Sequence, residues 1–398
     1  MYLTIIILPL LGSIASGLFG RKRTLSKKDN KKYLHTKVSK EPIGSEDSKE
    51  SKEPKDSEDS EGSKEPLGSK DSKESKESKD SKGHYFSGLV DGEGWFRVRI
   101  TRRSKYIIGW HVQAVFVVQA HIRDLLLLQQ LNNFLGGFGK IYQNTGSKKS
   151  MASLEIYSIA GLLRVLSHFS LYPLLTQKRA DFELFKLVVE MIQRKEHLTL
   201  AGLRRIVSIR ASMNWGLSDA LKKAFSDIVP FPRPSVNFNG KFNPFWLAGF
   251  VDGEGCFFVS LLKSTHCKLG VSISLEFSIS QHSRDMVVMN SLVAFFGCGR
   301  VKLDSRCSNV SYFVGKFSDI ISKIVPFFIQ YPLQSVKGLD FVDFCKVVEI
   351  MEAKGHLTLE GIEQVRAIKE GMNRGRVLQD NTQELRLSRD NTANETCT

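Results

Sequence analysis

One short motif occurs twice in this chain, and this repetition constrains the fold more than any other feature. GLVDGEGW begins at Gly88 and GFVDGEGC begins at Gly249, about 161 positions later. A solenoid needs several repeats of roughly 20 to 50 residues, so a single long repeat instead predicts two fused, pseudo-symmetric domains. A gene duplication without functional symmetry is the alternative that the pattern leaves open.

The similarity extends far beyond the motif. FVVQAHIRD matches FSISQHSRD, KRADFELF matches KGLDFVDF, and HLTLAGL matches HLTLEGI, beginning at Phe116 and Phe277, Lys178 and Lys337, and His197 and His356. The chain therefore repeats a whole domain and not only a motif. The histidines that recur are interpreted as core or capping residues, with none assigned to a metal: His121, His282, His197 and His356.

The net charge favours a polyanionic partner. The chain has 398 residues, 41% of them hydrophobic, which is enough for more than one buried core. Its formal charge is +15, and the 39 basic and 27 acidic residues after position 82 leave about +12 on the folded part. Such an excess is typical of nucleic-acid binding, although a merely soluble basic protein would show it too.

Composition divides the chain into segments. Residues 1–20 are almost wholly apolar and precede RKR, so this leader is long enough to span a bilayer or to act as an uncleaved signal. The next segment repeats SKE and SKD and contains too few large apolar side chains to offset its ordering entropy. The expected organisation is a leader at 1–23, a disordered Ser/Lys/Glu-rich spacer at 24–82, a first domain at 83–228, a linker at 229–243, a second domain at 244–375 and a polar tail at 376–398.

Hydrophobic periodicity predicts the same order of elements in both halves. Residues 84–90 form an apolar helix candidate, and residues 95–103 alternate apolar with Arg-rich positions, as expected for a strand with one wet face. A returning strand, a helix, a second hairpin and further helices follow. The predicted fold class is α+β, with two α-β-β-α-β-β-α halves that each contain a four-stranded antiparallel sheet.

The motif itself indicates a metal site. In both copies an apolar helix ends in two acidic residues separated by glycine, and small residues leave one face of each helix bare: Ser87, Gly88, Ala248 and Gly249. Two such helices can pack closely in parallel and bring Glu93 and Glu254 together. Two nearby carboxylates repel unless cations intervene. A glycine that merely caps a helix would explain one copy, but not two with identical acidic spacing.

These residues resemble the LAGLIDADG homing endonucleases of the single-chain, two-motif type. The resemblance covers roughly residues 84–375. The second motif keeps the usual Leu-Ala pair as Leu247 and Ala248, whereas the first has Phe86 and Ser87. It implies that the motif helices lie at the domain interface and that the two sheets form a saddle over double-stranded DNA.

The resemblance also implies a catalytic centre. Glu93 and Glu254 would hold two or more divalent ions, most plausibly Mg²⁺, helped by the backbone carbonyls of Gly92 and Gly253, and each half would cut one strand. Lys178 and Lys337 would polarise the solvent or neutralise the scissile phosphate, unless they are ordinary surface lysines. The first acidic residues of the motifs are expected to be structural: Asp91 and Asp252.

Recognition is assigned to the open faces of the sheets, because a two-stranded ribbon fits the major groove, where arginine pairs with guanine. A strand of about ten residues spans roughly 33 Å, so two sheets could read on the order of 20 base pairs. The expected base-reading residues are Trp95, Arg97, Arg99, Thr101 and Arg103, with Phe258 and Ser260 in the second half. The expected phosphate contacts, or simply solvated lysines and arginines, are Lys140, Lys148, Lys149, Lys263, Lys268 and Arg300.

The sequence therefore predicts a monomeric, mitochondrial, intron-encoded and site-specific DNA endonuclease. Residues 1–20 resemble the start of subunit 5 of fungal mitochondrial NADH dehydrogenase, which would make them upstream exon and, if retained, the one membrane contact. One alternative is an RNA maturase of the same fold, with the host group I intron RNA as partner. Another is a membrane-anchored respiratory fragment, which rests on the leader alone.

Overall fold

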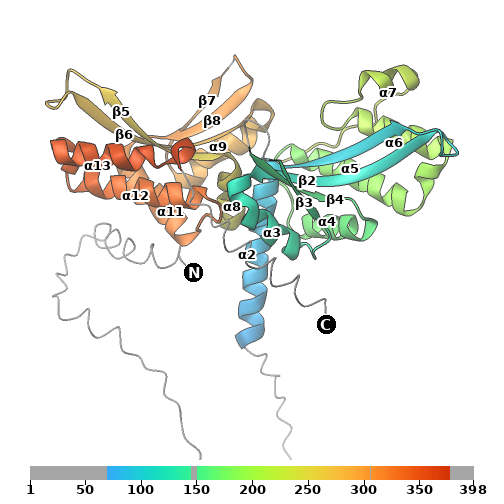
Figure 1. Cartoon of the computed structure of the whole chain (residues 1–398), viewed down its shortest axis with the longest axis horizontal. Coiled ribbons are helices and arrows are strands. Elements are labelled where there is room, and N and C mark those ends of the chain that lie inside the picture. The colour runs from blue at the N-terminus through green and yellow to red at the C-terminus, as the bar shows by residue number, and fades with distance from the viewer. Residues whose placement is uncertain (1–69, 145–149, 305, 377–398) are drawn as a thin grey trace, which may run out of the picture.

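The computed structural model describes residues 70–144, 150–304 and 306–376. These residues form two similar halves that meet along the helices α2 and α8 (Figure 1). Each half contains a four-stranded antiparallel sheet, with strand order β1-β2-β4-β3 in the first and β5-β6-β8-β7 in the second. The predicted α+β class, with two repeats of the same order, is confirmed.

The elements of the first half follow the predicted order. They are α2 (Lys70–Glu93), β1 (Gly94–Arg102), β2 (Trp110–His121), η2 (Ile122–Asp124), α3 (Leu125–Phe134), β3 (Lys140–Asn144), β4 (Met151–Ile156), α4 (Ile159–Leu171), α5 (Lys178–Gln193), η3 (Glu196–Leu198), α6 (Leu200–Ala211) and α7 (Asp219–Ala224).

The second half repeats this order. Its elements are α8 (Pro244–Glu254), β5 (Gly255–Lys263), β6 (Val271–His282), η4 (Ser283–Asp285), α9 (Met286–Phe296), β7 (Arg300–Asp304), β8 (Asn309–Val314), α10 (Phe317–Asp319), η5 (Ile320–Ile324), α11 (Val325–Gln330), α12 (Lys337–Glu352), η6 (Gly355–Leu357), α13 (Leu359–Glu370) and η7 (Asn373–Gly375).

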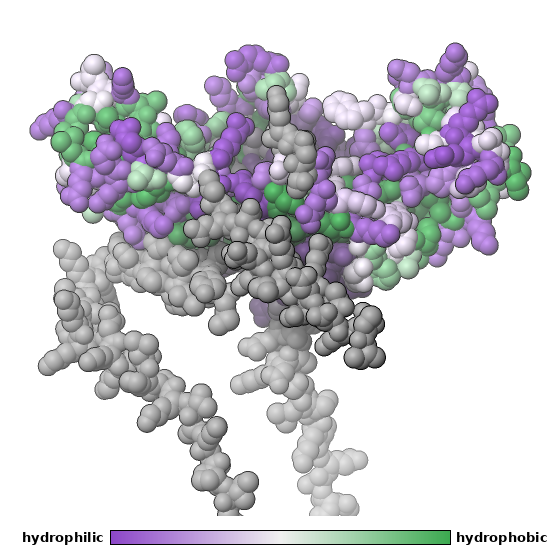
Figure 2. All heavy atoms as spheres, in the orientation of Figure 1, coloured by the Kyte–Doolittle hydropathy of each residue, from purple (hydrophilic) through white to green (hydrophobic). Residues whose placement is uncertain are grey.

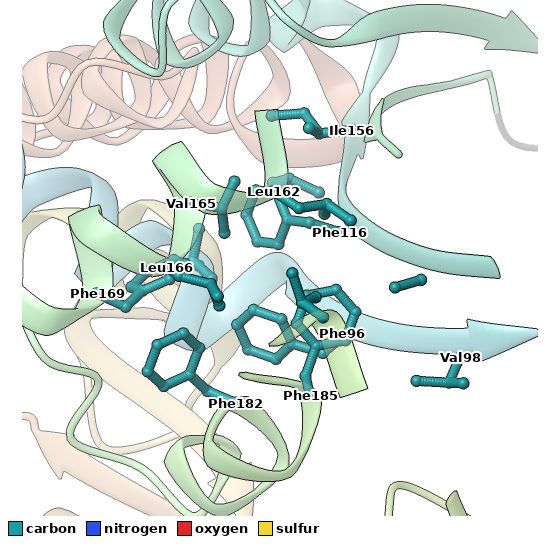
Figure 3. Close-up of a cluster of buried hydrophobic side chains, with 14 of the residues drawn as sticks. Phe96, Val98, Phe116, Ile156, Leu162, Val165, Leu166, Phe169, Phe182 and Phe185 are labelled. Carbon is teal, nitrogen blue, oxygen red and sulfur yellow. The ribbon is translucent and has the colours of Figure 1, made fainter. Parts of the chain in front are cut away.

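Each half has its own aromatic core beneath one face of its sheet. Phe96 of β1 is fully buried, and its ring lies 5.2 Å from that of Phe185 on α5 (Figure 3). Phe257 of β5 occupies the same place in the second half, 5.4 Å from Phe344 on α12. Large aromatic side chains dominate core energetics because each one removes much apolar area from water. These cores fix the first strand of each sheet directly after its motif helix.

The helix α2 begins at Lys70, which corrects the prediction that residues 24–82 form a disordered spacer throughout. Within the extension, the Ser81 hydroxyl donates to the Glu77 carbonyl at 2.9 Å, one helical turn earlier. Extending a helix that is already nucleated also costs little. The Tyr172 hydroxyl donates to the Asp80 carboxylate at 2.7 Å, so a contact from the end of α4 holds the extension.

Two arginines near the predicted domain ends make contacts that the sequence did not reveal. In the segment 229–243, predicted to be the linker, Arg233 binds the Asp181 carboxylate through two hydrogen bonds of 2.8 and 2.9 Å. Arg376, expected to begin the polar tail, pairs with Asp340 of α12 at 2.8 Å and therefore belongs to the second domain. In both halves an arginine beyond the last long helix thus neutralises a buried carboxylate.

One helical region breaks the symmetry of the repeat. Between the last strand and the dipeptide Tyr-Pro, the second half has one more residue than the first. The helix absorbs it as the π-helical turn Ile320–Ile324, as single-residue insertions in helices commonly do. Pro326, which lacks an N–H, follows within the next turn. The faces that α4 and α11 present to their sheets are thereby kept equivalent.

No helix within residues 70–144, 150–304 and 306–376 is long and apolar enough to cross a bilayer. Figure 2 shows hydrophilic and hydrophobic residues interspersed over both halves. The predictions for the leader and for most of the spacer fall on residues 1–69, which lie outside the described part of the chain.

Candidate active site

The motif helices α2 and α8 touch backbone to backbone. A methyl group placed on Gly88 would lie 1.8 Å from the carbonyl oxygen of Trp246, and one on Gly249 would lie 1.9 Å from that of Tyr85. Any side chain at either glycine would therefore force the helices apart. The close parallel packing predicted from the small residues is confirmed for this pair. Ser87, in contrast, turns away from α8 and donates to the Tyr172 carbonyl at 2.6 Å.

At the ends of these helices, each motif glutamate lies beside a glycine of the opposite motif. The Cγ of Glu254 lies beside Gly92, and the Cγ of Glu93 lies beside Gly253, each 3.4 Å from a methyl group placed on that glycine. Burial, and next the negative charge of Glu93, raise the pKa of Glu254 to about 7. Burial also raises the pKa of Glu93. The two carboxylates therefore repel each other, and a cation bound between them would reduce that repulsion.

A lysine supports the end of each motif helix. Lys178 Nζ donates to the carbonyls of Val90 and Asp91, both at 2.7 Å, and to that of Gly92 at 3.1 Å. Lys337 Nζ donates to the carbonyls of Val251 at 2.9 Å and Gly253 at 3.1 Å. An ammonium group is favourable at a helix C-terminus. The alternative of ordinary surface lysines is therefore wrong.

The charge of both lysines also acts on both glutamates. Burial lowers the pKa of Lys178 and of Lys337, while the surrounding carboxylates oppose that shift. Lys178 interacts with Glu254 of the opposite half as well as with Glu93. The centre therefore combines two carboxylates and two ammonium groups, contributed equally by the halves.

The first acidic residue of each motif is buried and points away from this centre. Asp91 accepts from the Leu175 N–H at 2.8 Å and, from the opposite half, the Trp246 indole N–H at 3.0 Å. Asp252 accepts from the Gln334 N–H at 2.7 Å and from the Tyr85 hydroxyl of the opposite half. Burial raises the pKa of Asp91 to about 6. These contacts suit the structural role expected for both aspartates.

The donor set fits a divalent cation that keeps part of its water shell. Within residues 70–144, 150–304 and 306–376 no cluster of three or more His, Cys, Asp or Glu side chains could hold a metal. Magnesium is typically held by one or two carboxylates, with waters and substrate phosphates completing its shell. Glu93 and Glu254 match that pattern. The carbonyls of Gly92 and Gly253 each accept from a lysine but retain a second lone pair.

Comparison with known proteins shows where this arrangement belongs. The model of the LAGLIDADG endonuclease family matches residues 86–189 and 247–348, which are the two halves around the two motifs. The chain belongs to the LAGLIDADG endonuclease family. "Probable intron-encoded endonuclease 3" of Neurospora crassa is 41% identical over 281 residues, 70% of this chain and 52% of that protein. The chain thus spans about half the length of this curated relative.

Two solved structures of this family have the same fold. The I-SmaMI LAGLIDADG homing endonuclease bound to cleaved DNA has a TM-score of 0.72 and 46% identity, covering 74% of this chain and 98% of that one. I-SmaMI bound to an uncleaved DNA target in the presence of calcium ions has a TM-score of 0.71 and 45% identity, covering 74% and 99%. Both halves of this LAGLIDADG chain, together with their interface, therefore have solved counterparts.

The open face of the first sheet carries most of the predicted recognition residues. The β1–β2 register puts Trp95, Arg97, Arg99 and Thr101 on the face away from the helices, and the β3–β4 register adds Lys140. Arg103 follows the end of β1 and is exposed. Arg97 is held by Glu155 on the same face, 2.8 Å away, so its guanidinium is already engaged. The predicted Lys148 and Lys149 lie outside the described residues.

The open face of the second sheet is less basic. Phe258, Ser260 and Arg300 lie on it, and Lys268 is exposed in the β5–β6 turn. Lys263 ends β5 on the side of the buried Phe257, not on the open face, and it is exposed there, so its phosphate contact stays a prediction. A strand that alternates apolar and polar residues reverses sides at each position, and Lys263 is one step out of phase.

Sequence reasoning missed the contacts that join the two halves. Tyr85 and Trp246 looked like ordinary apolar helix residues, yet each donates to the motif aspartate of the opposite half. Asp124 and Asp285 end the matched FVVQAHIRD and FSISQHSRD segments, and each accepts from a backbone N–H of the opposite half. Their repetition was the available signal, because the same aspartate ends the matched segment in both copies.

Proposed function

We propose that this chain is a divalent-metal-dependent, site-specific DNA endonuclease that makes a double-strand break. One observation carries the proposal: the two copies of the motif bring Glu93 and Glu254 together across a glycine-packed interface, with a lysine beside each. The family membership and the DNA-bound relatives support the same function. Magnesium is the cation that we propose, because few protein ligands are available and phosphates would complete the shell.

Each half contributes one glutamate and one lysine to the proposed reaction. Bound cations would activate a water and stabilise the leaving oxygen of each phosphodiester. Glu93 and Glu254 would hold the cations, because their carboxylates lie together at the ends of the two motif helices. Lys178 and Lys337 place positive charge beside the glutamates, where it favours the charge that develops on the phosphate. One cut per half then gives a break in both strands.

The open faces of the two sheets are proposed to read a long target. Strands β2 and β6 each have 12 residues, and at about 3.4 Å per residue each reaches on the order of ten base pairs. Arg99 and Lys140 offer charged groups on the first half, and Ser260 offers a hydroxyl on the second. We infer that the first half contributes more of the affinity and that the second reads through apolar and hydroxyl contacts.

The biological setting is proposed from the relatives and the leader together. A 37% identical relative over 117 residues is named "Uncharacterized 50.9 kDa protein in ND4 intron 1" of Podospora anserina. Residues 1–20 of this chain resemble the start of a mitochondrial NADH dehydrogenase subunit. We therefore propose mitochondrial intron homing, in which the chain acts as a monomer on the intronless allele.

The decisive experiment incubates the full chain with duplex DNA that joins the two exons, with and without magnesium. We expect a staggered double-strand cut that requires the metal. Glu93→Gln and Glu254→Gln should bind the duplex normally but lose cutting by at least about 100-fold, as for loss of a group that stabilises the transition state. The matched control is Glu183→Gln on α5, a half-exposed carboxylate 3.9 Å from Arg179, which should cut normally.

Two outcomes would contradict the proposal. Unchanged cutting by both glutamine variants would refute the metal-ligand assignment. An intact duplex, together with tight binding of the host intron RNA, would favour the maturase alternative instead.

A further inference from the structure

The start of α5 is held by carboxylates from both halves. Asp91, from the first half, accepts from the backbone N–H groups of Leu175 at 2.8 Å and Thr176 at 3.4 Å. Asp285, from the second half, accepts from the next N–H, that of Gln177, at 2.6 Å. Three successive backbone donors are therefore bound, and the last of them crosses the interface.

The start of α12 repeats this arrangement with the halves exchanged. Asp252, from the second half, accepts from the N–H groups of Gln334 at 2.7 Å and Ser335 at 3.3 Å. Asp124, from the first half, accepts from that of Val336 at 2.7 Å. Since Asp124 and Val336 are 212 positions apart, the same contact arises twice only because the interface is pseudo-symmetric.

These bonds act on the residue immediately before each lysine. Gln177 and Val336 are the N-cap residues of α5 and α12, and neither caps its helix with its own side chain. The first N–H groups of a helix have no intrahelical partner, and a carboxylate near them is favourable. Within each half, the hydroxyl two residues before the lysine accepts from the lysine's own N–H, at 3.2 Å in the first half and 3.0 Å in the second. The aspartate of the opposite half accepts from the preceding N–H, so both halves together fix where the helix starts and where Lys178 or Lys337 projects.

We propose that Asp124 and Asp285 are positioning residues that act across the interface. Asp124 of the first half orients Lys337 of the second, and Asp285 of the second half orients Lys178 of the first. Each lysine is therefore correctly placed only when the two halves are in contact. A half that lacks the contact to its opposite half should not cut its strand. This inference rests on the proposed function, in which each half cuts one strand.

The test compares cutting of the two DNA strands by the full chain. Each strand of the duplex target is labelled separately, and the nicking rates of wild type, Asp124→Ala and Asp285→Ala are measured at saturating enzyme. Displacing a reacting group by about 1 Å can cost on the order of 100-fold in rate. We expect each variant to slow one strand by about 10- to 100-fold more than the other, and the two variants to favour opposite strands.

Rescue and control variants separate positioning from loss of structure. Asp124→Asn keeps an oxygen that can accept from Val336 and should restore the wild-type strand ratio. Asp227→Ala removes an exposed carboxylate that pairs with Arg204 on α6 and should change neither strand. A variant that simply unfolds lowers the nicking rates of both strands equally and leaves their ratio unchanged, because both rates are measured on the same population of molecules.

The outcomes distinguish this inference from the function on which it rests. An intact duplex with wild-type protein would refute the proposed endonuclease. Cutting by the wild type, with equal slowing of both strands in Asp124→Ala and Asp285→Ala proteins that bind the duplex as tightly as wild type, would overturn the positioning role alone. A bias toward the same strand in both variants would also overturn it.

Discussion

Ser87 and His168 form a buried polar pair that has no counterpart in the second half. Ser87 Oγ lies 3.1 Å from His168 Nε2, whereas the matching positions of the second half are Ala248 and Phe327. Burial is the main cause that lowers the pKa of His168 to about 3, with a smaller contribution from the charge of Arg164. The imidazole is therefore neutral in the folded protein over most of the acidic range.

This neutral histidine makes the stability depend on pH. Because its folded pKa lies below its unfolded value of about 6.5, its contribution is present above pH 6.5 and is lost as the pH falls toward 3, at about 1.4 kcal/mol per pH unit. His168→Phe, which copies the second half, should therefore lose less stability between pH 6.5 and pH 4 than wild type. Urea unfolding at both pH values measures this difference. His266→Phe, in an exposed turn, should keep the wild-type slope, and an unchanged slope in His168→Phe would refute the assignment.

The sequence could identify site residues only where the repeated motif itself contains them. Glu93 and Glu254 were predictable because the repeat placed two acidic groups at equivalent helix ends. The donors to Asp91 and Asp252 were not, because Trp246 lies 155 positions from Asp91 and only the interface brings them together.

At the scale of elements, the contact between α2 and α8 depends on two glycines. Gly249→Ala would put a methyl group 1.9 Å from the Tyr85 carbonyl oxygen, where only a shift of the backbone can relieve the clash. Overpacking costs typically about 1–3 kcal/mol, and we expect the upper end because the opposing atom is backbone. Cutting should fall as well, since Glu254 follows Gly249 by five residues on the same helix.

Thermal unfolding and cutting assays on Gly249→Ala test this prediction, with Gly315→Ala as the control. A methyl group on Gly315 would meet only the Leu275 carbonyl oxygen at 3.8 Å, an ordinary contact. A Gly249→Ala protein as stable as this control would show that the helices can separate without cost.

Periodicity predicted most elements because each strand and helix buries one regular face. It missed the extension of α2 to Lys70, which is exposed at residues 77–80 and contacts the rest of the first half through Tyr172. It also missed the π-helical turn at Ile320–Ile324, since an extra residue in one copy becomes visible only when the two halves are superposed.

At the scale of the whole molecule, the two halves contact each other as the subunits of a dimer do, although one chain joins them. The halves share the glycine contact between α2 and α8 and the hydrogen bonds of four aspartates to the opposite half: Asp91, Asp124, Asp252 and Asp285. The joining segment is pinned to the first half through Arg233, and it leads to an exposed turn at Gly240. Continuity of the chain is therefore not what holds the site together.

Cutting the chain at this turn tests that conclusion. Gly240 suits the insertion of a protease recognition sequence, because it is exposed and a methyl group placed there has no neighbour within 4 Å. After cleavage we expect the halves to elute together in size exclusion at micromolar concentration and to retain most of the DNA cutting. The same insertion in Gly249→Ala should release the halves, because the helix contact is weakened while the joining segment is identical. The halves of the protein that carries only the insertion could instead separate on cleavage. The linker would then supply an effective concentration that the interface needs, and assembly from two separate chains would fail as well.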